Sequence, residues 1–157
     1  MDPIFKKLNY KDQPSILVLQ APESFQTNME AMKTFTQPLL ETDALEAIEF
    51  AIAFVTRQEE INELVPRLVP RLKGDAVLWL CYPKSTSKKY TCNFNRDTGW
   101  AILGAHGMEP VRQVAIDEDW SALRFRRVEY IKKITRSENF AMTAEAKRRT
   151  THKKSTN

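Results

Sequence analysis

Residues 84–89 read KSTSKK, and this stretch carries the side chains best suited to holding an anion. Three lysines, two serines and one threonine occupy its six positions. Ammonium groups and hydroxyl donors can bind a phosphate through charge-assisted hydrogen bonds. The residues that we assign to such a site are Lys84, Ser85, Thr86 and Lys88. The alternative is a solvated connection, because exposed loops are built from the same residue types. The sequence leaves both interpretations open.

A second group is the acidic triplet DED, from Asp117 to Asp119, which is followed by Trp120. Its carboxylates could hold Mg²⁺ beside a bound phosphate. They could instead pair with nearby lysines or begin the turn before Trp120, and we favour this structural role. We expect Trp79, Trp100 and Trp120 to be core residues. Trp120, at the hairpin turn, is the one of the three most open to partial exposure, and stacking on a ligand ring is the alternative to packing there.

The cysteines and histidines give little support for catalysis or metal binding. Cys92 and His106 are fourteen residues apart and match no known nucleophile–base signature. His106 precedes Gly107, where a histidine commonly caps a helix. The chain has two cysteines and two histidines and no CxxC spacing, which argues against zinc. We therefore predict no catalytic residue, no metal, no cofactor and no disulfide.

Apolar runs alternate with helical patterns along the chain. We predict strands over residues 15–20, 37–41, 49–56 and 75–83, and a strand pair over residues 109–117 and 122–131. Helices are predicted over residues 23–34, 57–73 and 96–106, with a break or kink near Val65 caused by Pro66 and Pro70, and a cap at Asn95 or Asp97.

This alternation predicts an α/β fold. We expect a three-layer, Rossmann-like domain with a mainly parallel sheet that ends in an antiparallel strand pair. Such sheets bind ligands at the carboxyl ends of their parallel strands. The anion loop and the acidic triplet should both lie at that edge.

The charge is unevenly distributed along the chain. Residues 1–125 contain 14 basic and 17 acidic residues, whereas residues 126–157 contain 10 basic and 3 acidic ones. We predict a single domain over residues 1–136 and a basic, partly helical or disordered tail over residues 137–157. The tail could contact nucleic acid through phosphates. No apolar run is long enough for a membrane span, and the amino terminus lacks a signal-peptide core, so we expect a cytoplasmic protein.

The layout resembles the core of a class I S-adenosylmethionine-dependent methyltransferase, above all in LVPRLKGDAVLWLCYPK (residues 68–84) and the strand hairpin that follows. This resemblance implies a cofactor-binding role for Glu41, which stands about 20 residues past the first strand, where an acidic residue binds a ribose hydroxyl. The sequence departs from the family after that strand. Its turn reads QAPES, and none of the four glycines precedes Gly74. Without glycines the backbone is hindered from approaching the cofactor closely.

Residues 4–129 also resemble the bacterial family called domain of unknown function 3052. The segments that carry the similarity are KKLNYKDQPSILVLQAPESF, AFVT, LKGDAVLWLCYPK and DEDWSALRF. This resemblance implies a small Rossmann-like domain and supplies no catalytic residues.

Together these features favour a non-catalytic binding or interaction module, whose ligand would be a small anion or a protein partner. The alternatives are a divergent nucleotide- or S-adenosylmethionine-using transferase, and a protein that associates weakly with nucleic acid through its tail.

Overall fold

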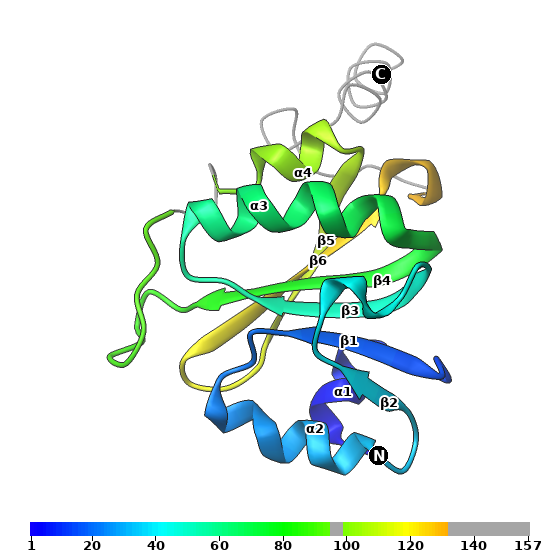
Figure 1. Ribbon diagram of the computed structural model, residues 1–157. Helices are drawn as coiled ribbons and strands as arrows, with labels where there is room; N and C mark the ends of the chain where they lie inside the picture. Colours follow the sequence, from blue (N-terminus) through cyan, green and yellow to red (C-terminus); the bar gives the residue numbers. More distant parts are fainter. Residues whose placement is uncertain (95–98, 132–157) are drawn as a thin grey trace, which may run out of the picture.

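The computed structural model describes residues 1–94 and 99–131. A six-stranded sheet crosses the molecule in the order β2-β1-β3-β4-β6-β5 (Figure 1). Strands β1 to β4 are parallel, β6 is antiparallel to β4, and β5 is antiparallel to β6. The strands are β1 (Ser15–Leu19), β2 (Gln37–Leu39), β3 (Ile48–Phe54), β4 (Leu72–Pro83), β5 (Met108–Ala115) and β6 (Trp120–Arg127).

Helices cover both faces of this sheet, as Figure 1 shows. Helices α3 and α4 lie on one face, and α1 and α2 lie on the other. The α-helices are α1 (Pro3–Lys7), α2 (Gln26–Met32), α3 (Gln58–Leu68) and α4 (Ala101–Ala105), and the 3₁₀ turns are η1 (Glu23–Phe25), η2 (Thr42–Ala44), η3 (Val69–Arg71) and η4 (Val128–Tyr130). The predicted three-layer α/β class, with its terminal antiparallel pair, is confirmed.

The continuous apolar character of the central strands follows from their burial on both faces. In β3, the side chain of Phe50 packs among the aromatic residues of the α1–α2 face, and that of Ala51 faces the α3–α4 layer. Helix α3 buries Ile61, Leu64 and Leu68 against its side of the sheet. Spacings of three and four place these residues on one helix face, which is why the helix docks there.

Two helix predictions need correction. The helix expected over residues 57–73 does not break near Val65, because α3 continues through Pro66 to Leu68. The backbone changes to the 3₁₀ turn η3 only at Val69, directly before Pro70. The helix expected over residues 96–106 is described only as α4, since Gly99 and Trp100 form a turn before it.

Residues 95–98 and 132–157 lie outside the described parts of the chain. The predicted caps Asn95 and Asp97, and the predicted basic tail, therefore remain predictions. Within residues 1–94 and 99–131, no helix combines the length and apolar character that a bilayer span requires.

Helix α1 was not anticipated from the sequence, although its start carries a recognisable signal. The Asp2 carboxylate accepts a hydrogen bond from the amide of Phe5 at 3.1 Å, and Pro3 occupies the first helical position. A buried bond then joins this helix end to the sheet. The indole Nε1 of Trp79, which is 0% exposed, donates to the carbonyl of Leu8 at 2.8 Å.

We predict that Trp79→Phe destabilises the fold more than Trp100→Phe does. Both indoles are buried, but the Nε1 of Trp100 has no hydrogen-bond partner among the described residues. Only Trp79→Phe leaves a buried carbonyl unsatisfied, which costs about 1–3 kcal/mol beyond the loss of ring area. Urea unfolding of the two variants measures this difference. Equal losses of unfolding free energy would contradict the role assigned to the Trp79–Leu8 bond.

Candidate ligand-binding site

The carboxyl edge of the sheet gathers two of the loops that the sequence analysis singled out. Strand β5 runs in the same direction as β4, because both are antiparallel to β6. The turn over residues 116–119, which follows β5, therefore meets the loop over residues 84–94, which follows β4. The prediction that the anion loop and the acidic triplet share one edge is confirmed by direct contacts between them.

Asp119 is the residue that joins the two loops. Its backbone carbonyl accepts a hydrogen bond from the amide of Lys84 at 2.8 Å. Its side-chain Oδ1 accepts another from the hydroxyl of Ser87 at 2.7 Å. The same hydroxyl oxygen accepts from the amides of Lys89 and Tyr90, at 3.3 and 3.1 Å. One serine therefore closes the loop on itself and ties it to the hairpin turn.

The other end of the loop is held by Asn93. Its backbone amide donates to the carbonyl of Thr56 at 3.1 Å, and its side-chain Oδ1 accepts from the backbone amide of Gln58 at 2.7 Å. These two bonds attach the loop to the turn between β3 and α3. The loop is thus fixed at two separate points on the sheet edge.

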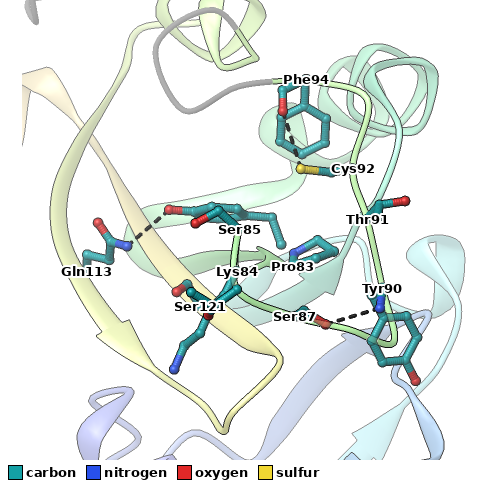
Figure 2. A pocket seen from close by; sticks show the side chains of 12 residues that line it. Pro83, Lys84, Ser85, Ser87, Tyr90, Thr91, Cys92, Phe94, Gln113 and Ser121 are labelled. Carbon is teal, nitrogen blue, oxygen red and sulfur yellow. Dashed lines mark hydrogen bonds between the residues drawn. The ribbon is translucent and has the colours of Figure 1, made fainter.

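A cavity of about 630 Å³ lies beneath this loop (Figure 2). Its volume falls in the range of small-molecule sites. Strands β4, β5 and β6 and the loop contribute its lining: Tyr82, Pro83, Lys84, Ser85, Thr86, Ser87, Tyr90, Thr91, Cys92, Phe94, Gln113 and Ser121.

The floor of the cavity carries polar groups from three neighbouring strands. The amide Nε2 of Gln113 on β5 donates to the hydroxyl of Tyr82 on β4 at 3.0 Å, a bond that is drawn in Figure 2. Ser121 on β6 is the direct cross-strand partner of Tyr82. Ser121 is only 7% exposed, and its hydroxyl has no hydrogen-bond partner among the described residues. A bound molecule could satisfy that hydroxyl.

The walls are partly aromatic. Phe94 packs against the buried Trp100 with ring centroids 5.2 Å apart, and Tyr82 packs against the same indole at 5.5 Å. Tyr90 lies on the other side of the loop, against Trp120. The cavity therefore combines apolar ring surface with a few polar groups, which is the usual composition of a small-molecule site.

The lining contains one cationic side chain, that of Lys84. It makes no ion pair with any described residue, so its charge is available to a ligand. Ser85 and Thr86 are exposed beside it. Three of the four predicted anion-site residues, Lys84, Ser85 and Thr86, thus line the cavity. The fourth, Lys88, is exposed and does not.

The acidic triplet has the structural role that the sequence analysis favoured. The Oδ1 of Asp117 accepts from the amides of Asp119 and Trp120 at 2.8 and 2.9 Å, so it shapes the turn. The carboxylate of Asp119 accepts a hydrogen bond from the hydroxyl of Ser87. Within residues 1–94 and 99–131, no group of three or more His, Cys, Asp or Glu side chains is arranged to hold a metal ion.

The packing role favoured for Trp120 is confirmed, and the alternative of partial exposure is wrong. Its side chain is 3% exposed and packs between Phe54 and Tyr90, with ring centroids 5.2 and 4.9 Å away. The turn residues before it are polar, but β6 begins at Trp120 and directs the indole into the α1–α2 face. It lies outside the cavity lining, while Trp79 and Trp100 are core residues as predicted.

The two thiols differ in environment. Burial raises the pKa of the Cys81 thiol well above its usual range, and the nearby charge of Asp117 acts in the same direction. Cys92 is only half buried, lines the cavity, and donates from Sγ to the carbonyl of Phe94 at 3.3 Å. No disulfide joins the two. Cys92 is thus the thiol that a reagent entering the cavity would meet.

Glu41 lies two residues past the end of β2 and is exposed, outside the lining of the loop cavity. The turn after β1 contains Gln20 with a φ of 56°. This is the left-handed conformation that glycine adopts without strain. The turn therefore has the backbone form of a glycine turn at this position, although the residue is glutamine.

Solved structures of similar fold include methyltransferases. A SAM-dependent methyltransferase from Aquifex aeolicus aligns with 80% of this chain and 88% of its own, at a TM-score of 0.53 and 13% identity. The phosphoethanolamine N-methyltransferase 2 of Haemonchus contortus aligns with 93% of this chain and 42% of its own, at a TM-score of 0.53 and 12% identity. The pyocyanin biosynthetic protein PhzM aligns with 80% of this chain and 53% of its own, at a TM-score of 0.51 and 10% identity.

This chain has a class I methyltransferase-like Rossmann fold. At these identities the similarity concerns the fold alone. No protein-family model matches the sequence, and no curated protein is significantly similar to it. The predicted likeness to a class I methyltransferase core is confirmed at the level of fold, whereas the resemblance to the family of unknown function 3052 stays a prediction.

We predict that Ser87→Ala loosens the loop over residues 84–90, whereas Ser85→Ala does not. Ser87→Ala removes the bond to the Asp119 carboxylate and the acceptor for two amides. Ser85 is exposed and makes no hydrogen bond with described residues. A hydrogen bond to a charged group contributes about 1.5–3 kcal/mol. Amide hydrogen exchange should therefore accelerate about tenfold or more in this loop for Ser87→Ala, and equal exchange in the two variants would contradict the assignment.

Proposed function

We propose that this protein binds a small anionic molecule in the loop cavity and acts as a binding module. The observation that carries the proposal is that Lys84, which forms no ion pair with a described residue, lines one cavity with Ser121, whose hydroxyl forms no hydrogen bond with a described residue. An anionic group could accept hydrogen bonds from both. The aromatic rings of Tyr82, Tyr90 and Phe94 would contact the apolar remainder of the ligand.

The electrostatics of the cavity favour an anion over a cation. The nearest carboxylate in the adjoining turn, Asp119, is hydrogen-bonded to Ser87 and lies outside the cavity lining. A ligand in the cavity would thus meet the charge of Lys84 and the hydroxyl groups without an opposing acidic side chain in the lining. The partial burial of the site strengthens such interactions relative to water.

Protection of Cys92 from alkylation would test this proposal. Phenyl phosphate serves as the probe, because it carries both an oxyanion and a ring. It should slow the reaction of Cys92 with iodoacetamide in a saturable way, while the buried Cys81 remains unreactive in the folded protein. The Lys84→Gln variant should weaken binding about tenfold or more, since a charge-assisted hydrogen bond contributes about 1.5–3 kcal/mol.

The matched control is Lys11→Gln, which removes an equal charge from an exposed position outside the cavity. It should bind the probe as the parent protein does. Unchanged alkylation of Cys92 at all probe concentrations would refute the anion site, as would equal weakening by the two lysine variants.

A divergent S-adenosylmethionine-using transferase is the second candidate function. Two observations favour it: the methyltransferase-like fold, and the left-handed backbone at Gln20 after β1, with Glu41 following β2. In this function the cofactor would lie at the ends of β1 and β2, where Glu41 would bind a ribose hydroxyl. The resemblance to the family of unknown function 3052 would then describe a branch that has lost the glycines of the first turn.

Isothermal titration calorimetry with S-adenosylmethionine distinguishes this candidate from the first. The transferase function requires saturable binding that Glu41→Ala weakens about tenfold and that Lys84→Gln leaves unchanged. If S-adenosylmethionine gave no heat of binding with the parent protein or with either variant, the transferase function would be excluded. The anion site would still be tested separately by the Cys92 protection experiment.

A further inference from the structure

The β5–β6 hairpin presents different residues to its two faces. Gln113 and Ser121 face the loop cavity on the α3–α4 side, in line with the core residue Leu123. Because side chains alternate along a strand, Arg112 and Arg124 point to the opposite, α1–α2 side. The arginine face is therefore separate from the cavity.

Arg112 and Arg124 are direct partners across the two strands. Like charges in this arrangement repel and destabilise a sheet. Neither side chain forms an ion pair or a hydrogen bond with any described residue, and the Nε of Arg124 is buried without a partner. The pair thus combines uncompensated charge with unused donors.

The nearest acidic residue does not neutralise the pair, because another arginine occupies it. Arg126 donates from Nε and Nη2 to the two carboxylate oxygens of Asp75, at 2.8 and 2.6 Å. The pKa of Arg124 is lowered by burial first and then by the charges of Arg126 and Arg112, while Asp75 only partly offsets these effects. Asp75 is therefore already engaged by Arg126 and only partly offsets the charge of Arg124.

We propose that Arg112 and Arg124 bind phosphate groups of a nucleic-acid strand. The planar guanidinium group matches phosphate oxygens in a bidentate way, and Arg112 is exposed beside the half-buried Arg124. Two adjacent cations suit a ligand with repeated negative charges.

The composition of the chain beyond β6 favours nucleic acid over the other occupants of this face. Residues 128–157 carry 8 basic and 3 acidic residues, so this segment is unsuited to neutralise the arginines itself. The same excess of positive charge would add phosphate contacts along a polyanion. The proposal is independent of the loop-cavity function, because it concerns the opposite face of the hairpin.

Fluorescence anisotropy with a labelled single-stranded oligonucleotide tests this proposal on the full chain. The Arg112→Gln/Arg124→Gln double variant should bind about tenfold or more weakly at ~0.1 M salt. Its plot of log affinity against log salt should be shallower by about 1.4, the value for two lost phosphate contacts on a single strand. Arg112→Gln alone, at an exposed position, should lower the slope by about 0.7, which keeps the test valid if the double variant folds poorly.

The matched control is Lys7→Gln/Lys11→Gln, which removes two charges from exposed positions that form no ion pair with described residues. It should retain the affinity and slope of the parent. Equal losses in both double variants, unchanged binding in the arginine variants, or equally tight binding of polyglutamate that the arginine variants also lose, would each overturn the assignment to nucleic acid.

Discussion

The pairing of β4 with both β3 and β6 is the constraint on which the rest of the structure depends. β4 is parallel to β3 from Val77 to Cys81 and antiparallel to β6 as far as Pro83. A slip of one residue would turn every side chain of a strand to the other face. It would move Trp79 away from the α1–α2 core and Tyr82 out of the cavity. The registers of these strands therefore fix both the hydrophobic core and the floor of the candidate site.

The same registers explain how one small domain can keep two charged surfaces apart. On β6, Ser121 faces the cavity, whereas Arg124 faces the other side. Two acidic groups near these surfaces are already engaged: Asp119 by Ser87, and Asp75 by Arg126. Positive charge therefore remains at Lys84 on one face and at the arginine pair on the other. Both surfaces would favour anions, but through different geometries.

The sequence predicts the architecture well because the buried strands are long, apolar and separated by helical patterns. It also predicts the position of the Lys84 loop, since parallel strands end at a common edge. It could not predict Ser121, Gln113 or Phe94 as cavity residues, because each is placed by strand register or loop contacts with residues far along the chain. The alternative of partial exposure for Trp120 has a similar origin: local polarity suggested exposure, whereas packing against Phe54 buries the ring.

We propose that the loop cavity, rather than the turn after β1, is the ligand site of this protein. Backbone amide chemical shifts, recorded during separate titrations with phenyl phosphate and S-adenosylmethionine, test it most directly. We expect phenyl phosphate to cause saturable chemical-shift changes at Lys84, Ser85 and Ser121. We expect S-adenosylmethionine to leave the chemical shifts of the protein unchanged. Shifts from S-adenosylmethionine at Gln20 and Glu41, with none from phenyl phosphate at the loop, would contradict it.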